Sequence, residues 1–502
     1  MLERIKRAQS IHLVGISGTE GSAIMLFLLK LGVDFTAHDF SPEAKFKRSF
    51  KANHLGYSPS AKEKILGKII ANRSRINFQD NYLKDIGKAD LIFVSQNWEA
   101  YSPNRKLKRI FAQHPEKFMT LTQLYFQLFP GRIIAVTGTN GKSTTTKLIA
   151  KIVQVHSTNT RHQLKSGRQT AYFTGNDRRN VQILDRFDKW QKSDILAIEV
   201  SNRQLKFPLG RAPEIGVVTN VSPNHLDEYI DSFSAYKRGK FSLIANQKSK
   251  AISVLNYDNI VTRNFAKKVK SQVLFYSTKS KLSKGLPDEA LAKAGVYVEN
   301  GWIVDKQKNS QSTIKICPVD KIKLIGEHNL SNVLAATAAC RSVGVNKKII
   351  CEVLGKFHGI PQRLELVLQK NGIRFINDSS STTPESTIAA LRSFPRGSVH
   401  LIAGGDPKGV DYGTLVLAIK RQEARVTLLK SSLANILSKS LKKEGVGFKI
   451  VENLQEAVRI SSQNAANGEV VLLSPSAAWF CYFAGKIPLG GRGFEQFART
   501  FV

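Results

Sequence analysis

The chain has 502 residues, too many for one hydrophobic core, and domains of roughly 100–200 residues predict three of them. Hydrophobic residues make up 42% and charged residues 23%, which is typical of a globular protein, and the apolar run at 23–29 is far shorter than the ~20 residues that span a bilayer. The formal net charge of +36 favours anionic ligands such as nucleotides or nucleic acid, but the basic residues are spread along the chain, as in a general bias toward lysine and arginine.

The first predicted domain, residues 1–130, begins as a doubly wound nucleotide-binding fold. The basic start of the chain leads into a predicted strand at 11–14 rather than a signal sequence, so we expect a cytoplasmic protein. A loop with three glycines, a predicted helix at 22–31 and a strand that carries Asp39 follow, and a further buried strand is predicted at 89–96. Asp39 lies about 20 residues beyond the loop, where an acidic residue commonly meets a ribose or a base edge. The loop breaks the strict G-x-G-x-x-G pattern, so its signal alone is weak.

The second predicted domain, residues 131–358, opens with a phosphate-binding loop between a strand and a helix. In the sequence RIIAVTGTNGKSTTTKL, a buried strand is predicted at 133–136, and the glycine turn GTNGKST at 138–144 leads into the helix. Glycines let backbone amides approach phosphate oxygens, and the helix N-terminus adds partial positive charge. Lys142 would reach the outer phosphates, and one of the two hydroxyl residues after it would hold Mg²⁺. A glycine-rich turn without a ligand is the alternative.

Two more strands of this domain end near candidate metal-binding residues. A predicted strand at 194–200 carries Glu199 near its end, where a carboxylate beside a phosphate loop usually holds Mg²⁺; an acid that faces solvent is the alternative. The next strand, at 215–221, leads into a turn that holds His225. The helix predicted after it carries Lys240, which in isolation would belong to a solvated basic face.

The end of the second domain is a strongly helical run that follows a polar turn. Asn329 and Asn332 lie at its start, three residues apart, and therefore share one face of the helix. Helix capping by asparagine is the alternative to a binding role.

The third predicted domain, residues 359–502, is a second doubly wound domain. Two strands around an Asn-Gly turn are predicted at 363–378, and a polar loop then leads into a helix. A strand that starts at His400 ends in a glycine-rich turn with Lys408, and strands and helices alternate from there on. The four cysteines, at 317, 340, 351 and 481, are far apart and lack C-x-x-C spacing, so we expect separate thiols rather than a zinc site or a disulfide framework.

Five motifs follow one another along nearly the whole chain: GTNGKST at 138–144, EVSNRQL at 199–205, NVSPNHLDEY at 220–229, GEHNLSN at 326–332 and NDSSST at 377–382. In this order they resemble the Mur ligases, the ATP-dependent amide-forming enzymes of peptidoglycan precursor synthesis. The segments SAYKRGK, GGDPKGVDY and LSPSAAW are similar to those of the members that add D-glutamate to UDP-N-acetylmuramoyl-L-alanine. The opening IHLVGISG is closer to the members that add L-alanine.

The resemblance implies an α/β enzyme with a Rossmann-like UDP-sugar-binding domain, a central P-loop ATPase-like domain with a parallel sheet, and a C-terminal Rossmann-like domain that binds the amino acid. It implies ATP and two Mg²⁺ ions, with a carbamylated lysine at position 240 that turns an ammonium into an anionic oxygen ligand. The catalytic residues it implies are Lys142, His225 and Lys240, and the metal ligands are Ser143, Glu199, His225 and Lys240. ATP is expected at Gly138, Thr139, Asn140, Gly141, Lys142, Ser143, Thr144, Asn329, Asn332, Arg363 and Asp378. The UDP precursor and the amino acid are expected at Ser17, Gly18, Thr19, Asp39, Asn176, Thr382, Lys408 and Phe483.

The reaction that the resemblance implies has two steps. The substrate carboxylate attacks the γ-phosphate of ATP to give an acyl phosphate, and the amino group of the incoming amino acid then displaces phosphate. Because the ATP-binding residues come from two domains, closure of the third domain should assemble the site. We expect a monomer that binds no nucleic acid, because no RNA-binding or helix-turn-helix signature accompanies the diffuse charge; a nucleic-acid-binding P-loop NTPase is the alternative.

Three positions of the third domain depart from the pattern of the D-glutamate-adding members. Ser380 stands where a lysine is typical, Trp479 replaces a serine, and Cys481 replaces an aspartate. These changes leave the added amino acid open, with L-alanine and L-glutamate as alternatives. The intact Lys142 and Glu199 argue against a member that binds the precursor without ligating it.

Overall fold

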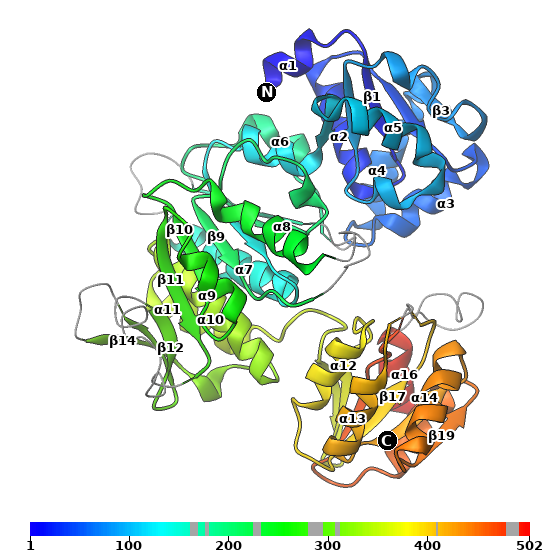
Figure 1. The fold of residues 1–502 in the computed structure, drawn as a ribbon, viewed down its shortest axis with the longest axis vertical. Coiled ribbons are helices and arrows are strands. Elements are labelled where there is room, and N and C mark those ends of the chain that lie inside the picture. Colours follow the sequence, from blue (N-terminus) through cyan, green and yellow to red (C-terminus); the bar gives the residue numbers. More distant parts are fainter. Residues whose placement is uncertain are drawn as a thin grey trace. The chain divides into compact units, whose positions relative to one another are not determined.

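The computed structural model describes residues 1–160, 169–175, 180–223, 232–279, 295–306, 312–407, 410–477 and 491–501. The chain forms two compact units, one made by Met1–Lys321 and Ser331–Leu354, the other by Ile322–Leu330 and Gly355–Val502. The fold is α/β, with two sheets in the first unit and one in the second (Figure 1). Among the described helices, none is both long and apolar enough to cross a lipid bilayer.

The first sheet has five parallel strands in the order β3-β2-β1-β4-β5. The chain winds outward from β1 in both directions, as in a doubly wound nucleotide-binding fold. The strand predicted at 11–14 is confirmed, and the helix predicted at 22–31 begins earlier, because Gly18 is extended and acts as its N-cap. The strands are β1 (Ile11–Val14), β2 (Thr36–Asp39), β3 (Ile76–Phe78), β4 (Leu91–Val94) and β5 (Phe118–Thr120). The helices are α1 (Leu2–Arg7), α2 (Thr19–Leu31), α3 (Glu43–Asn53), α4 (Pro59–Ile70), α5 (Arg105–Gln113) and α6 (Leu121–Leu128).

The second sheet has nine strands in the order β14-β13-β12-β11-β10-β9-β6-β8-β7. Its strands are β6 (Arg132–Thr137), β7 (Ala171–Thr174), β8 (Ile195–Glu199), β9 (Ile215–Val218), β10 (Ile252–Asn256), β11 (Gln272–Ser277), β12 (Gly295–Glu299), β13 (Trp302–Lys306) and β14 (Thr313–Pro318). The helices around it are α7 (Lys142–Thr160), α8 (Phe233–Ala245), α9 (Ile260–Ala266), α10 (Glu327–Ser342) and α11 (Lys347–Lys356).

The central sheet is parallel over most of its width, as expected, and antiparallel at its far edge. Strands β7 to β12 pair in parallel, but β13 runs antiparallel to β12 and to β14. The reversal between β12 and β13 occurs at Asn300 and Gly301, whose φ angles are +49° and +74°. An Asn-Gly pair with two positive φ angles forms the tight turn that joins antiparallel strands.

The sheet of the second unit has six strands in the order β15-β16-β20-β17-β18-β19. The hairpin predicted around the Asn-Gly turn is confirmed, with positive φ angles at Asn371 and Gly372 between β15 and β16. The strands are β15 (Glu365–Lys370), β16 (Ile373–Asn377), β17 (Val399–Ala403), β18 (Arg425–Leu429), β19 (Phe448–Val451) and β20 (Val470–Leu473). The helices are α12 (Pro384–Leu391), α13 (Gly413–Gln422), α14 (Ser432–Lys443), α15 (Leu454–Gln463) and α16 (Gly491–Phe501).

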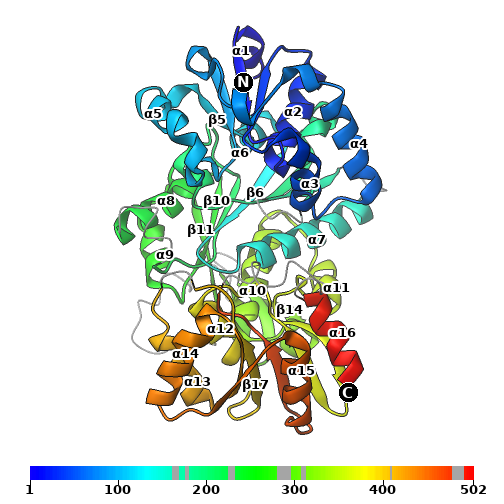
Figure 2. The same ribbon diagram turned by 90° about the vertical axis from the view of Figure 1, so that its right-hand side faces the viewer.

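Helices cover both faces of this last sheet, and successive residues of its strands alternate between the two cores. In β20, Val470 and Leu472 belong to the core formed with α12, α13 and α14, whereas Val471 and Leu473 belong to the core formed with α15 and α16. Figure 2 shows these two groups of helices on either side of the sheet. This alternation follows from the two-residue period of a strand. Burial on both faces explains why β20 reads as an unbroken apolar run.

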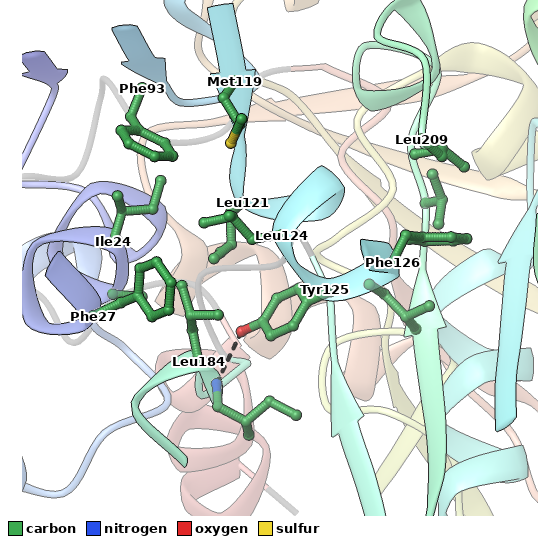
Figure 3. Packing of buried hydrophobic residues seen from close by; sticks show 14 of the residues in the cluster. Ile24, Phe27, Phe93, Met119, Leu121, Leu124, Tyr125, Phe126, Leu184 and Leu209 are labelled. Carbon is green, nitrogen blue, oxygen red and sulfur yellow. Dashed lines mark hydrogen bonds between the residues drawn. The ribbon is translucent and has the colours of Figure 1, made fainter. Parts of the chain in front are cut away.

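The two sheets of the first unit share one continuous hydrophobic core, shown in Figure 3. Ile24 and Phe27 of α2 and Phe126 of α6 belong to the same cluster as Leu184, which lies in the short helix η7 (Leu184–Lys189) beside the central sheet. At the centre, the buried Tyr125 hydroxyl accepts the Ile183 N–H at 2.9 Å and donates to Oε1 of Gln182 at 3.0 Å.

The expectation of separate thiols is wrong for two of the four cysteines. Cys317 on β14 and Cys351 on α11 form a disulfide, with Cα atoms 4.9 Å apart. The two residues are 34 positions apart, and only the tertiary fold brings the strand beside the helix, so their spacing carries no motif. Cys340 is a buried free cysteine, and burial raises the pKa of its thiol.

Candidate active site

The glycine loop of residues 138–141 lies at the carboxyl end of β6, between β8 and β9 of the central sheet. Gly138 and Gly141 have φ angles of +147° and +82°, which strongly favour glycine. A Cβ at Gly138 would lie 1.9 Å from Oγ1 of Thr219, and one at Gly141 would lie 2.1 Å from Oδ1 of Asn332. Both glycines are therefore required by backbone conformation and by close neighbours.

Residues that follow β9 hold this loop in place. The backbone N–H of Thr139 donates to the Asn220 carbonyl at 2.8 Å, and the N–H of Asn140 donates to Oδ1 of Asn220 at 3.0 Å. Thr219 donates from Oγ1 to the Asn140 carbonyl at 2.5 Å. The sequence analysis assigns no role to Thr219 or Asn220. The polar NVSPN segment directly after a predicted strand is the feature of the sequence that points to them.

The loop leads directly into α7, whose first turn carries the predicted phosphate-binding residues. Lys142 donates from Nζ to the carbonyls of Gly138 at 3.0 Å and of Thr139 at 2.9 Å, so its ammonium lies over the loop. Ser143 and Thr144 follow in the same turn. The N-terminus of this long helix and the lysine ammonium give the loop positive potential, which suits the phosphates of a nucleotide.

Glu199 and Lys240 converge on the same edge of the sheet. Glu199 ends β8, pairs in register with Val136 of β6, and its side chain is buried. Lys240 of α8 is fully buried and donates from Nζ to Oγ1 of Thr137 at 3.3 Å. Tyr236, one turn earlier on α8, has its ring 5.4 Å from that Nζ, and its hydroxyl is 3.2 Å from Oγ1 of Thr139.

These groups fit a magnesium ion in part. The Ser143 hydroxyl and the Glu199 carboxylate are hard oxygen donors of the kind that Mg²⁺ prefers. The amine of Lys240 could contribute only after conversion to a carbamate. Within the described ranges, no group of three or more His, Cys, Asp and Glu side chains gathers around one point. The predicted residues His225, Asn176, Lys408 and Phe483 lie outside the described residues.

A second cleft lies at the carboxyl ends of β1, β2 and β4, where the winding of the first sheet changes direction. This position is where doubly wound sheets bind nucleotides. Its volume is about 280 Å³, and its lining comprises Gly15, Ser17, Gly18, Thr19, Glu20, Phe40, Ser41, Ser49, Asn53, Ser95, Gln96, Asn97 and Tyr101. The predicted residues Ser17, Gly18 and Thr19 are therefore part of the cleft wall.

Asp39, predicted beside the same ligand, shapes the cleft from behind. Its carboxylate is fully buried and accepts the N–H of Ser17 at 2.8 Å with one oxygen and the N–H of Ser41 at 3.0 Å with the other. Asp39 thus fixes the glycine loop after β1 and the segment after β2 relative to each other.

Glu20 connects this cleft to the segment that follows Glu199. One oxygen of its buried carboxylate accepts the Gln96 N–H at 2.7 Å, and the other accepts Nε2 of Gln204 at 3.4 Å. Ser201 donates from Oγ to Oε1 of Gln96 at 2.8 Å. Burial raises the pKa of Glu20 from 4.5 to about 7, with the hydrogen bonds acting in the opposite direction. No motif in the sequence marks this residue.

The second unit brings Asp378 and its neighbours together at the carboxyl ends of β16 and β20. Asp378 is buried and accepts the Leu364 N–H at 3.2 Å and Oγ of Ser474 at 2.8 Å. Burial raises its pKa from 3.8 to about 6. Arg363 lies between Gln362 and Leu364, whose φ angles of +67° and +44° are uncommon for such residues.

The other residues predicted for this unit lie in the loop after Asp378 and at the start of α10. Thr382 belongs to the segment that precedes α12, and Asn329 donates from Nδ2 to the Ile325 carbonyl at 2.8 Å. Asn332, on the part of α10 that belongs to the first unit, accepts Oγ1 of Thr145 at 3.4 Å. The Oγ atoms of Ser379 and Ser476 are buried without a hydrogen-bond partner, so this edge of the sheet holds polar atoms that a ligand can satisfy.

The first unit also contains a larger cavity, of about 800 Å³, next to the carboxyl end of α8. Pro213 and Glu214 in its lining precede β9, so the cavity lies at the amino ends of the strands, opposite the glycine loop. Glu214 has a structural role in this cavity, since its carboxylate accepts the Ile133 N–H at 2.8 Å and an Arg211 N–H at 2.5 Å. We place the chemistry at the glycine loop because ligands of open α/β sheets bind at the carboxyl ends of strands.

Comparison with known proteins identifies the family to which this chain belongs. Residues 136–340 match the Mur ligase middle domain, and residues 362–477 match the glutamate ligase domain of Mur ligases. A UDP-N-acetylmuramoylalanine–D-glutamate ligase from Acetivibrio thermocellus is 31% identical over 95% of this chain and 93% of its own length. The chain belongs to the Mur ligase family.

This Mur ligase is also similar to further relatives along its whole length. A UDP-N-acetylmuramoylalanine–D-glutamate ligase from Koribacter versatilis is 30% identical over 99% of this chain and 98% of its own length. The solved structure of UDP-N-acetylmuramate-alanine ligase MurC from Thermotoga maritima has a TM-score of 0.56 and 17% identity, and the match covers 98% of each chain. As a member of this family, the Mur ligase described here is an ATP-dependent ligase of peptidoglycan precursor synthesis.

Proposed function

We propose that this Mur ligase joins D-glutamate to UDP-N-acetylmuramoyl-L-alanine and converts ATP to ADP and phosphate. The observation that carries the proposal is the convergence of Lys142, Glu199 and Lys240 on the rigid glycine loop at the carboxyl end of β6. This is a phosphoryl-transfer site, and it lies in a chain whose full-length relatives are named for the addition of D-glutamate.

The three predicted domains divide the work in this proposal. Residues 1–130 hold the UDP-linked substrate in the cleft of the first sheet, with Asn176 from the neighbouring domain at its pyrophosphate. Residues 131–358 hold ATP at the glycine loop, with Asn332 behind it. Residues 359–502 hold the amino acid and supply Arg363 and Asp378 to ATP. Asn329, from the end of the second predicted domain, contacts the adenine. The amino-acid contacts in this assignment are Thr382, Lys408 and Phe483.

The proposed reaction begins when the carboxylate of the UDP precursor attacks the γ-phosphorus of ATP. The bond from that phosphorus to the bridging oxygen breaks, ADP leaves, and an acyl phosphate forms. The amino group of D-glutamate then attacks the acyl carbon, loses a proton to a base for which His225 is the candidate, and expels phosphate. Lys142 and the amides of the glycine loop stabilise the charge that develops on the transferred phosphoryl group.

Magnesium would neutralise phosphate charge in this site. We assign Ser143 and Glu199 to one ion, and His225 and a carbamylated Lys240 to a second. The burial of Lys240 supports a modified side chain, because a carbamate would supply the anionic oxygen ligand that Mg²⁺ prefers. Bicarbonate should then raise the activity of dialysed enzyme, and the Lys240→Arg variant should not respond to it.

A second candidate is a Mur ligase that adds another amino acid, such as L-alanine or L-glutamate. Ser380, Trp479 and Cys481 favour it, because they replace a lysine, a serine and an aspartate that are typical of D-glutamate-adding members. These substitutions remove a cation and add a bulky indole near the expected amino-acid pocket.

The test is release of phosphate from ATP by the purified protein with Mg²⁺, bicarbonate and UDP-N-acetylmuramoyl-L-alanine. D-glutamate, L-glutamate and L-alanine are offered in turn, and UDP-N-acetylmuramate replaces the precursor for L-alanine. Release with D-glutamate alone supports the proposal, and release with another amino acid supports the second candidate. No release with any pair would refute both and direct attention to nucleic acid as the activator. Hydroxylamine should trap the acyl phosphate as a hydroxamate, and Lys142→Ala should abolish both signals.

A further inference from the structure

Two aromatic side chains stand apart from all the others in the described part of the chain. Phe40 and Tyr101 are 37% and 40% exposed, and every other described Phe, Tyr and Trp side chain is more buried than these. Exposed aromatic side chains that lie together and are rimmed by polar residues are typical of ligand-binding grooves. The two exposed rings are therefore candidates for ligand contact.

The rings of Phe40 and Tyr101 lie next to each other in one cleft. Their centroids are 5.2 Å apart, with the planes tilted by 37°. Both residues line the cleft at the carboxyl ends of β1, β2 and β4, together with Ser17 and Gly18 of the glycine loop. Phe40 directly follows β2, and Tyr101 follows the segment after β4, so the pair forms the aromatic part of the wall.

The pair is also braced from behind. Tyr82 meets the Phe40 ring edge-on, with centroids 6.2 Å apart, and donates from its hydroxyl to Oδ1 of Asn104 at 2.5 Å. Asn104 is buried and donates from Nδ2 to the Trp98 carbonyl at 2.7 Å. A platform that is already ordered loses little conformational entropy when a flat ligand stacks on it.

We propose that Phe40 and Tyr101 bind the nucleobase of the UDP-linked substrate by stacking against its ring. The cleft then recognises a nucleoside diphosphate with two chemically different parts: amides of the glycine loop and the N-terminus of α2 for the phosphates, and the aromatic pair for the pyrimidine. Base–aromatic stacking is tolerant of base identity, so the pair supplies affinity and the polar wall supplies the choice of base. This inference rests on the proposed function, because it takes a uridine diphosphate substrate as given.

The test measures binding of two probes by calorimetry, with the ATP site filled by AMP-PNP and Mg²⁺. UDP contains the base, and inorganic pyrophosphate does not. The variants are Phe40→Ala and Tyr101→Ala, with Phe40→Trp as the variant that keeps an aromatic face. Tyr297→Ala, which removes a half-buried aromatic ring on β12, is the matched control. Removal of one stacking ring should weaken UDP binding by about 5- to 150-fold and leave pyrophosphate binding unchanged.

The outcomes separate the inference from the proposed function. Selective loss of UDP affinity in both alanine variants, with Phe40→Trp close to wild type, supports stacking. Equal loss of UDP and pyrophosphate affinity means that the variants disturb the whole cleft, which overturns the inference. Unchanged UDP affinity in both alanine variants also overturns it, assigns the exposed pair to another partner and leaves the proposed function intact. Failure of the wild type to bind UDP refutes the UDP-linked substrate, and the inference falls with it.

Discussion

Replacement of Gly141 by alanine tests how the phosphate loop is held. Gly141 has a φ of +82°, and a Cβ there would lie 2.1 Å from Oδ1 of Asn332. The left-handed conformation alone costs an alanine about 1–2 kcal/mol. The close approach adds a second cost, because Asn332 is buried and cannot move without repacking. We expect Gly141→Ala to lower the free energy of unfolding by about 2–4 kcal/mol when both costs are included.

A matched glycine separates the two costs. Gly344 has a φ of +87°, and no atom lies within 4 Å of the Cβ that an alanine would add. Gly344→Ala should therefore show the backbone cost of about 1–2 kcal/mol without a clash and should leave phosphate release unchanged. Gly141→Ala should lower kcat/KM for ATP by on the order of 100-fold, since a small displacement of a catalytic loop has effects of that size.

The interaction with Asn332 is measured by a double-mutant cycle in urea denaturation. Asn332→Ala removes the side chain that the new methyl group would meet, so the double variant should be more stable than the sum of the single effects predicts. We expect a coupling free energy of about 0.5–3 kcal/mol in that direction. Strict additivity would refute the reasoning, because it would mean that the methyl group and the Asn332 amide do not meet.

Three further predictions concern buried polar groups of the first unit. Tyr125→Phe leaves the Ile183 N–H without its acceptor, so it should lower the free energy of unfolding, measured in urea, by about 1–3 kcal/mol. The control Tyr297→Phe should change this free energy by less than about 0.5 kcal/mol. Equal effects of the two variants would contradict the hydrogen bond between Tyr125 and Ile183. Asp39→Asn keeps one acceptor oxygen for two N–H groups, so it should lower stability by a similar ~1–3 kcal/mol and weaken UDP binding in the same titration. The pKa of Glu20 is raised from 4.5 to about 7, so the folded state keeps a proton that the unfolded chain releases, and this group's contribution to stability declines as pH rises through that window. Urea denaturation at pH 5 and pH 8 should show a smaller decline for Glu20→Gln than for the wild type; the same decline in both would exclude Glu20 as the source.

The sequence was sufficient for those features that depend on local pattern. The strand at 11–14, the glycine loop before α7 and the Asn-Gly hairpin between β15 and β16 were all predictable from neighbouring residues. The signals are a short apolar run before a glycine loop, glycine at positive φ, and an Asn-Gly turn. The hairpin at Asn300 and Gly301 carries the same turn signal, so the antiparallel edge of the central sheet also has a local signature in the sequence.

Features that depend on contacts between distant residues were not predictable. Thr219 and Asn220 hold the glycine loop from the next strand of the sheet, and Cys317 meets Cys351 only because β14 lies beside α11. Asp39 was predicted beside the ligand, whereas its buried carboxylate accepts backbone amides of the two loops. No local pattern distinguishes that use from contact with a ligand. Phe40 and Tyr101 are unremarkable in sequence, and only the fold exposes them together.

The core shared by the two sheets of the first unit limits how chains of this kind can be recombined. Phe27 of α2 meets Phe187 edge-on, with centroids 5.0 Å apart, and Lys30 forms an ion pair with Asp188 at 2.6 Å. A chimera cut near residue 130 would place a foreign α2 and α6 against the native η7 and leave these pairs mismatched. Exchange of the substrate-binding segment between relatives therefore has to carry η7 with it. Substitutions in α2, α6 and η7 should therefore be correlated among relatives, because the three elements pack against one another.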